Sequence, residues 1–141
     1  MKVKDIMTTD VVKICPQETA DVAARTLEHY NIGALPVCGL DGSLRGVLTD
    51  RDLVVRCLAS GKQNGTLVGD LMTKQVITVT PETEVAEAAA IMGRNQIRRL
   101  PVVKDRTVCG MLSLGDISAR GESAEKAAGA LSAISSGLSK R

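Results

Sequence analysis

The pattern of hydrophobic and polar positions predicts a short strand followed by an amphipathic helix, and this order occurs twice along the chain. Residues 11–15 and 76–80 are rich in β-branched side chains and each run is stopped by a proline, which predicts two short strands. Apolar residues at i, i+3, i+4 and i+7 spacing follow each run and predict an amphipathic helix. These residues are Ala20, Ala23, Ala24 and Leu27 in the first copy and Val85, Ala88, Ala89 and Met92 in the second.

A hairpin pattern follows each predicted helix. Two short apolar segments flank a turn at Asp41-Gly42 in the first copy and near Asp105-Arg106 in the second. The paired segments are 35–38 with 44–48, and 100–103 with 108–112. Pro36 and Pro101 place the first strand of each hairpin at an edge or a strand start, because proline cannot donate to a ladder. A further helix is expected after each hairpin.

The two copies share residues as well as a pattern. Asp5-Ile6-Met7-Thr8 returns as Asp70-Leu71-Met72-Thr73, and Leu35-Pro36-Val37 returns as Leu100-Pro101-Val102. Such a period predicts one supersecondary unit used twice, because neither copy buries its apolar face alone. We expect an α/β (α+β) fold, whose parts are a first repeat over 1–61, a connector over 62–69, a second repeat over 70–121 and a tail over 122–141.

The tail carries an amphipathic stripe. Its apolar positions are Ala124, Ala127, Ala128, Leu131, Ile134 and Leu138. Helical spacing of this kind fits a helix that packs on its own module, and it also fits a helix that forms a dimer or binds a partner. Both interpretations stay open.

Composition restricts the class of protein. Hydrophobic residues make up 44% of the chain, yet Phe and Trp are absent and Tyr30 is the single tyrosine, so the core must be aliphatic. A formal charge of +2 without a basic block does not favour nucleic-acid binding. No apolar run approaches the roughly 18 residues that span a bilayer, and the first residues have no signal-peptide core. We therefore expect a cytoplasmic protein without a membrane partner.

Candidates for catalysis or metal binding are few. His29 is the only histidine and falls on the polar side of its predicted helix. The four cysteines Cys15, Cys38, Cys57 and Cys109 have no CxxC spacing, so no zinc site is expected. They are interpreted as small buried side chains, or, for Cys15 and Cys38, as a redox pair. We assign no catalytic and no metal-binding residue.

The residues that end each hairpin carry the clearest chemistry. Thr49 and Ser113 each close a strand, and an aspartate follows three positions later, at Asp52 and Asp116. One interpretation is structural, since hydroxyl and carboxylate at this spacing cap a helix. The other is a nucleotide site, in which the carboxylate accepts ribose hydroxyls and free backbone N–H groups hold a phosphate. Spacing alone does not decide between them.

The order of these motifs resembles a CBS domain. The residues that carry the resemblance are DIMT, the proline, the alanine pair, LeuProVal and Gly-x-Leu-Thr-Asp-Arg-Asp. These motifs or their close counterparts, with DLMT and Gly-x-Leu-Ser-Leu-Gly-Asp in the second copy, occur twice in the same order over residues 5–120. Two copies resemble a CBS pair, or Bateman module. The resemblance implies β-α-β-β-α repeats packed sheet to sheet about a pseudo-twofold axis, with two interdomain clefts for adenosine compounds. It also implies a homodimer.

The resemblance further implies roles for single residues. Asp52 and Asp116 match ribose-binding aspartates, and Thr49 and Ser113 match hydroxyls that contact ribose or phosphate. The adenine pocket walls are matched by Val12, Ile77, Ile32, Ile97, Pro36 and Pro101. Arg51 in the first copy, and Arg98 and Arg99 in the second, lack counterparts and make the two sites unequal. Such arginines suit a phosphate chain or, alternatively, a solvated surface.

Two functions follow from these features. The leading one is a non-catalytic sensor that binds AMP, ADP, ATP, S-adenosylmethionine or NAD, needs no obligatory cofactor, and signals to a separate effector protein. The rival is a redox or stress-related structural protein with Cys15–Cys38 as its thiol pair and unoccupied clefts. An enzyme is disfavoured, because the sequence holds no catalytic constellation.

Overall fold

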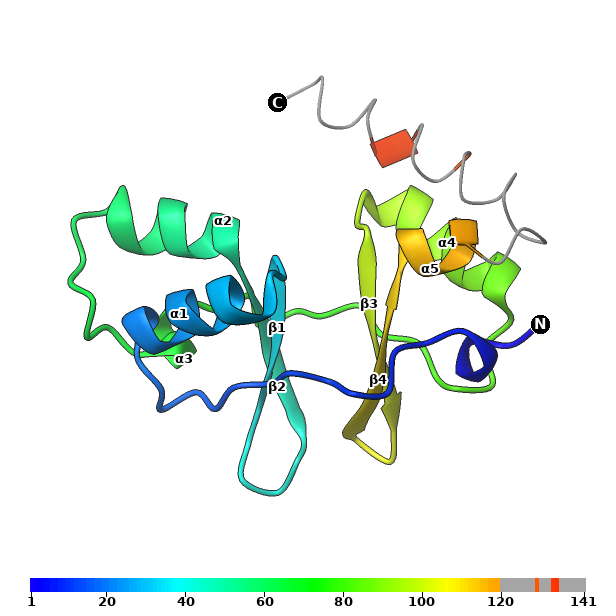
Figure 1. Ribbon diagram of the computed structural model, residues 1–141, viewed down its shortest axis with the longest axis horizontal. Helices are drawn as coiled ribbons and strands as arrows, with labels where there is room; N and C mark the ends of the chain where they lie inside the picture. Colours follow the sequence, from blue (N-terminus) through cyan, green and yellow to red (C-terminus); the bar gives the residue numbers. More distant parts are fainter. Residues whose placement is uncertain (120–128, 130–132, 135–141) are drawn as a thin grey trace. The chain divides into compact units, whose positions relative to one another are not determined.

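The computed structural model describes residues 1–119, Gly129, Ala133 and Ile134, and they form two compact units. The central unit holds residues 12–76 and 106–108. The terminal unit holds Met1–Val11, Ile77–Asp105 and the described residues from Cys109 onward. In Figure 1 the helices of each unit lie to one side of a two-stranded antiparallel hairpin. The predicted mixture of helices and strands is confirmed.

The central unit contains the first hairpin. Its elements are α1 (Ala20–Tyr30), β1 (Ala34–Cys38), β2 (Leu44–Thr49), α2 (Asp50–Asp52), the π-helix η2 (Leu53–Leu58) and α3 (Val68–Leu71). β1 and β2 pair antiparallel, and Gly42 adopts a φ of 82° in the predicted turn between them. Helix η2 ends before Gly61, whose φ of 72° suits a residue without a Cβ atom.

The terminal unit repeats this plan with small differences. Its elements are the 3-10 turn η1 (Val3–Asp5), α4 (Val85–Asn95), β3 (Arg99–Lys104), β4 (Thr107–Ser113) from Cys109 onward, and α5 (Leu114–Ala119). β3 and β4 form its two-stranded sheet. Asp105 and Arg106 turn the chain with φ values of 52° and 69°, so the predicted turn is confirmed without a glycine. Helix α5 begins two residues before Asp116, the expected start.

The compact units differ from the sequence repeats, because the first segments of the repeats are exchanged. Residues 1–11 open the first repeat but lie in the terminal unit with the second hairpin. There the Val3 N–H donates to the Thr83 carbonyl at 2.8 Å, and the Thr8 N–H donates to the Met111 carbonyl at 2.9 Å. Residues 70–76 open the second repeat but lie in the central unit, where Thr73 pairs with Val47.

The predicted strands at 11–15 and 76–80 are wrong. Each segment makes one parallel bridge to its hairpin, Ile14 with Val37 and Val79 with Val102, and forms no named strand. The next ladder bond toward the N-terminus would need an N–H at Pro36 or at Pro101. Proline has none, so the parallel pairing stops after a single bridge.

Each unit has its own aliphatic core. The central core contains Ile14, Ala20, Ala23, Leu27, Leu35, Val37, Leu48, Cys57, Val68 and Leu71. The terminal core contains Val3, Ile6, Val79, Val85, Ala88, Ala89, Met92, Leu100, Val102, Leu112, Leu114, Ile117 and Ile134.

Most of the predicted helix faces are buried in these cores. Ala24 is the exception, since it is exposed although it was assigned to the inner face of α1. Of the predicted stripe in the tail, Ile134 is described and packs in the terminal core, while its other positions lie outside the described residues.

Candidate functional site

The first-repeat corner, residues 49–52, lies where β2 ends and α2 begins. Thr49 and Asp52 bond reciprocally: the Thr49 N–H donates to Asp52 Oδ2 at 2.9 Å, and the Asp52 N–H donates to Thr49 Oγ1 at 3.0 Å. This is a capping box with aspartate in the place of glutamate. Asp52 is 8% exposed, so the corner holds a nearly buried carboxylate.

The second-repeat corner, residues 113–116, has the same geometry. The Ser113 N–H donates to Asp116 Oδ2 at 2.8 Å, and the Asp116 N–H donates to Ser113 Oγ at 3.0 Å. In both repeats the hydroxyl and the carboxylate that the sequence predicts as capping groups therefore each accept from the backbone N–H of the other residue. The capping interpretation is correct, and it does not exclude a ligand, because each cap uses only one carboxylate oxygen.

The other oxygen of each aspartate distinguishes the corners. Asp52 Oδ1 lies 3.7 Å from Nε of Arg56, one turn further along the helix. Asp116 Oδ1 has no hydrogen-bond or ion-pair partner among the described residues; Arg120, the counterpart of Arg56, lies outside them. Carboxylate oxygens in this position accept hydroxyl hydrogens, and adjacent hydroxyls on a ribose match that capacity.

Backbone amides of the first-repeat corner are not free to hold a phosphate, as the nucleotide interpretation required. The Asp50 N–H donates to the Gly33 carbonyl at 3.0 Å, and the Arg51 N–H donates to Asp50 Oδ1 at 2.8 Å. The N–H groups of Thr49 and Asp52 are taken by the cap. That part of the prediction is wrong, because local side chains and the preceding loop already satisfy the helix start.

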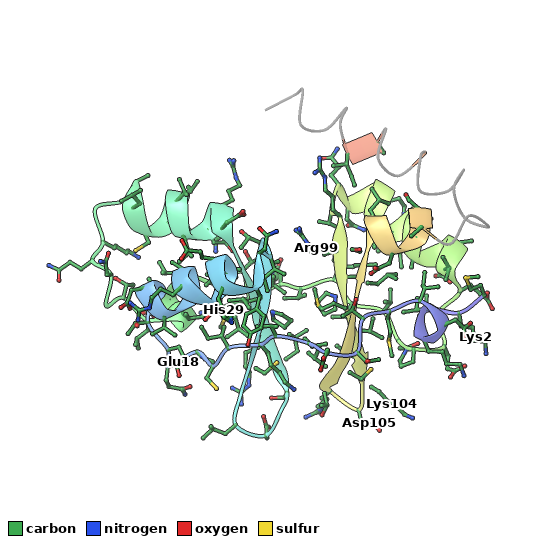
Figure 2. All side chains as sticks on the ribbon, in the orientation of Figure 1. Lys2, Glu18, His29, Arg99, Lys104 and Asp105 are labelled. Atoms are coloured by element: carbon green, nitrogen blue, oxygen red, sulfur yellow. The ribbon has the colours of Figure 1, made fainter. Side chains whose placement is uncertain are left out.

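The segment before each hairpin meets the corner through one backbone bond. In the second repeat the Leu114 N–H donates to the Arg98 carbonyl at 2.9 Å, which places Arg98 and Arg99 beside Ser113. Both arginines are exposed, and Figure 2 shows Arg99 at the start of β3. In the first repeat Gly33 and Ala34 occupy the same place, so that corner lacks both cations.

The predicted wall residues of the first repeat lie close to its corner along the fold. Ile32 precedes Gly33, and Pro36 accepts a bond from the Ile14 N–H at 3.0 Å. Pro36 is buried, and Val12 and Ile32 are half-buried against the central core.

The second repeat arranges its wall residues in the same way. Ile97 precedes Arg98, and Pro101 accepts a bond from the Val79 N–H at 3.1 Å. Pro101 is buried and Ile97 is half-buried against the terminal core, whereas Ile77 is 39% exposed. Each repeat therefore brings a capped aspartate and an aliphatic segment into one neighbourhood.

Two arginines of the first repeat lie at or next to its corner, and only one of them was a sequence-based candidate. Arg51 is exposed, as its position on α2 allows. Arg56 was not a candidate, yet it faces Asp52 and also donates to the carbonyls of Leu71 and Met72 at 3.1 and 3.0 Å. The i, i+4 spacing from Asp52 could have identified it.

The remaining candidates are not among the residues of the two corners. His29 is exposed on α1, with its ring edge-on to that of Tyr30 at 4.7 Å between centroids. Cys38 and Cys57 are buried, Cys15 and Cys109 are half-buried, and all four are free thiols. Within residues 1–119 and the three described tail residues, no three His, Cys, Asp or Glu side chains cluster as a metal site would require. None of the helices described there has the length and apolar character needed to cross a bilayer.

Comparisons with known proteins identify the family of the chain. The family model of the CBS domain matches residues 3–58 and 68–122. The CBS domain-containing protein YhcV of Bacillus subtilis is 38% identical over 133 residues, which cover 94% of each chain.

Two solved structures show the same fold. The CBS domain pair of protein MJ0100, in complex with 5′-methylthioadenosine and S-adenosyl-L-methionine, is 32% identical with a TM-score of 0.76 and covers 85% of this chain and 94% of its own. CBSX2 in complex with AMP is 30% identical with a TM-score of 0.77 and covers 88% of this chain and 98% of its own. With two family matches over most of its length, the chain belongs to the CBS domain family and carries two copies of the domain in tandem.

Proposed function

We propose that the chain is a non-catalytic regulatory CBS pair that binds an adenosine-containing ligand at its two corners. One observation carries the proposal: Asp52 and Asp116 are each fixed by a reciprocal cap through Oδ2, which directs the second oxygen away from the cap. A pre-positioned carboxylate loses little conformational entropy when it accepts the two hydroxyls of a ribose. The complexes of MJ0100 with adenosyl ligands and of CBSX2 with AMP support this ligand class.

In this proposal, arginine side chains near the corners bind the phosphate groups of the ligand. The amides of the first-repeat corner are occupied, so a phosphate there would depend on the exposed Arg51. The second-repeat corner has Arg98 and Arg99 beside it, and two guanidinium groups pair with more phosphate oxygens than one. We therefore assign the second-repeat corner a preference for phosphate-bearing ligands such as AMP, ADP or ATP.

Regulation requires that the ligand bind two arrangements of the protein with different affinity. We propose that an effector protein binds the arrangement that the ligand favours, and that the chain forms a homodimer. Support for the dimer comes from apolar side chains on helix η2: Val54, Val55 and Leu58 are 55%, 45% and 76% exposed. Exposed aliphatic residues on one short helix suit burial against a second copy.

Thermal unfolding with AMP, ADP, ATP, S-adenosylmethionine and NAD tests the proposal. A ligand at about 100 times its dissociation constant should stabilise the protein by about 2.7 kcal/mol. Asp52→Asn and Asp116→Asn keep an acceptor for the cap but replace the second oxygen with an amide that cannot accept a ribose hydroxyl. Each shift is measured against the same variant without ligand, so a weakened cap does not imitate lost binding.

Asp70→Asn is the matched control, because Asp70 is an exposed aspartate at the start of α3 outside both corners. We expect it to keep the full ligand-induced shift. A shift that survives in the double variant of Asp52 and Asp116 would refute the assigned corners. No shift with any of the five compounds would refute the ligand class.

A further inference from the structure

Cys15 and Cys38 lie opposite each other on neighbouring segments of the central unit. The bridge between Ile14 and Val37 is parallel, so the next residues along both segments, Cys15 and Cys38, share the same register. The Cys38 N–H donates to the Ile14 carbonyl at 2.8 Å, which fixes that register at its C-terminal side. Residues in register on adjacent strands point their side chains to the same face.

The backbone spacing fits a covalent link. Adjacent strands lie roughly 4.8 Å apart, and the Cα atoms of a disulfide are usually about 4.4–6.8 Å apart. Pro16 follows Cys15 directly and restricts Cys15 to an extended backbone, which continues the register past the bridge. The parallel register therefore sets the two cysteines at a general strand spacing that lies within the Cα range of disulfides.

The two thiols differ in their exposure to solvent, and this difference suggests which of them reacts first. Cys15 is half-buried and within reach of a small reagent, whereas Cys38 is 4% exposed. Burial raises the pKa of the Cys38 thiol, Lys13 opposes this, and the neighbouring Cys15 thiol adds to it. An accessible cysteine beside a buried one suits a first attack at Cys15 followed by resolution at Cys38.

We propose that Cys15 and Cys38 form a reversible intramolecular disulfide with a low-molecular-weight disulfide as the oxidant. The Cys15 thiolate attacks one sulfur of the oxidant, forms a mixed disulfide and releases the first thiolate. The Cys38 thiolate then attacks Cys15 Sγ, forms the protein disulfide and releases the second thiolate. The two protons of the cysteine thiols end on the two released thiols, and two electrons pass from the protein to the oxidant.

The disulfide would link residues 11–15 covalently to β1, with which they otherwise make few backbone hydrogen bonds. Because Pro36 cannot donate to Val12, residues 11–15 pair with β1 only around Ile14. The same two segments carry the wall residues Val12 and Pro36. Oxidation therefore links the two segments that carry wall residues of the first-repeat corner. The second repeat has Thr80 and Val103 at the matching positions and cannot form the equivalent disulfide.

The test treats the folded full-length chain with oxidised glutathione and maps the products by mass. Trypsin separates the cysteines, because Cys15 falls in peptide 14–25, Cys38 in 26–45, Cys57 in 57–62 and Cys109 in 107–120. We expect two of the four thiols to be lost, the mass to fall by two hydrogen atoms, and peptides 14–25 and 26–45 to be joined. Dithiothreitol should restore all four thiols.

Variants separate the two steps. Cys38→Ser should trap glutathione on Cys15 as a mixed disulfide, and Cys15→Ser should leave Cys38 unmodified. Cys57→Ser and Cys109→Ser are the controls and should form the same link as the wild type. Four intact thiols, a persistent glutathione adduct in the wild type, or a link to Cys57, to Cys109 or to a second copy would overturn the proposal. No nucleotide is present, so the outcome is independent of the proposed ligand.

Discussion

Met72 lies against Gly46 so closely that a Cβ atom at position 46 would come within 2.8 Å of the methionine sulfur. The same Cβ atom would lie 2.6 Å from the Thr73 carbonyl oxygen. The other hairpin repeats the arrangement, since a Cβ atom at Gly110 would meet the Met7 sulfur at 2.6 Å. The methionine of each DIMT-like motif therefore requires the glycine of the other repeat's hairpin.

Gly46→Ala should cost more stability than Gly110→Ala. A methionine side chain can move, but the Thr73 carbonyl is held by the Val47 N–H at 3.0 Å. The nearest backbone oxygen at Gly110, that of Thr8, is 3.1 Å away and leaves more room. We expect losses of about 3 and about 1.5 kcal/mol in urea unfolding. Gly65→Ala is the control, with no atom within 4 Å, and equal losses at positions 46 and 110 would contradict the explanation.

Gln96→Gly should stabilise the protein. Helices α1 and α4 both end in a left-handed residue, Asn31 with a φ of 53° and Gln96 with a φ of 56°. Asparagine adopts this conformation at a lower cost than glutamine does, so relief of the strain should raise the free energy of unfolding by about 1 kcal/mol at position 96. Asn31→Gly is the matched comparison, and thermal unfolding of both variants should show the larger gain for Gln96→Gly.

Removing either hydroxyl should weaken the protein in the absence of any ligand. Thr49→Ala and Ser113→Ala each delete the acceptor for an aspartate N–H, a loss of about 1 kcal/mol at a helix start. Ser118→Ala, an exposed position on α5, should be neutral. If the two variants unfold like the wild type in urea, the caps do not contribute to stability.

The N-terminal segment should loosen in acid. The ammonium groups of Lys2 and Lys4, at 2.8 and 3.0 Å, lower the pKa of Glu82 from 4.5 to about 2. A lowered folded-state pKa means that the stabilisation is complete above pH 4.5 and is lost as the pH falls toward about 2. The protection factor of the Val3 amide against hydrogen exchange, referenced to the intrinsic exchange rate at each pH, should therefore fall over this range, modestly because the groups are exposed.

Glu82→Gln should remove this pH dependence, while Glu84→Gln, whose carboxylate pairs with the N-terminal amine and makes no ion pair with Lys2 or Lys4, should keep most of it. Carboxyl chemical shifts would report the titration of Glu82 directly. A midpoint near 4.5 would show that the two lysines do not act on this carboxylate.

The double variant Arg98→Gln, Arg99→Gln should lose affinity for AMP and keep affinity for adenosine. Charge-assisted bonds to phosphate are worth roughly 1.5–3 kcal/mol, so we expect AMP binding to weaken by about 10-fold or more. Calorimetry with both ligands separates the phosphate from the nucleoside contribution. Arg94→Gln, on the exposed face of α4, is the control, and a parallel loss of adenosine binding would contradict the assigned role.

The sequence predicted those features that depend on neighbouring residues. The Asp41-Gly42 and Asp105-Arg106 turns, the hairpins and the Thr49–Asp52 pairing are local, and all are present. The segments at 11–15 and 76–80 failed as strands because their pairing depends on N–H groups that distant prolines lack. β-Branched composition alone cannot reveal what the partner segment is able to donate.

The sequence patterns also could not predict contacts between residues that are far apart along the chain. The free amides expected at Asp50 and Arg51 are occupied, one by the Gly33 carbonyl seventeen positions earlier. Arg56 contacts carbonyls of a later segment as well as Asp52. The repeated Gly46 and Met72 were visible as shared residues, but nothing in their spacing shows that each glycine serves the other copy's methionine.

The exchanged first segments have a consequence for any single repeat. A repeat cut from this chain would retain a hairpin glycine without its methionine and a methionine segment without its glycine. Two such fragments could satisfy each other only as a domain-swapped pair, whose formation depends on concentration. Tandem fusion makes the same exchange intramolecular and therefore independent of dilution.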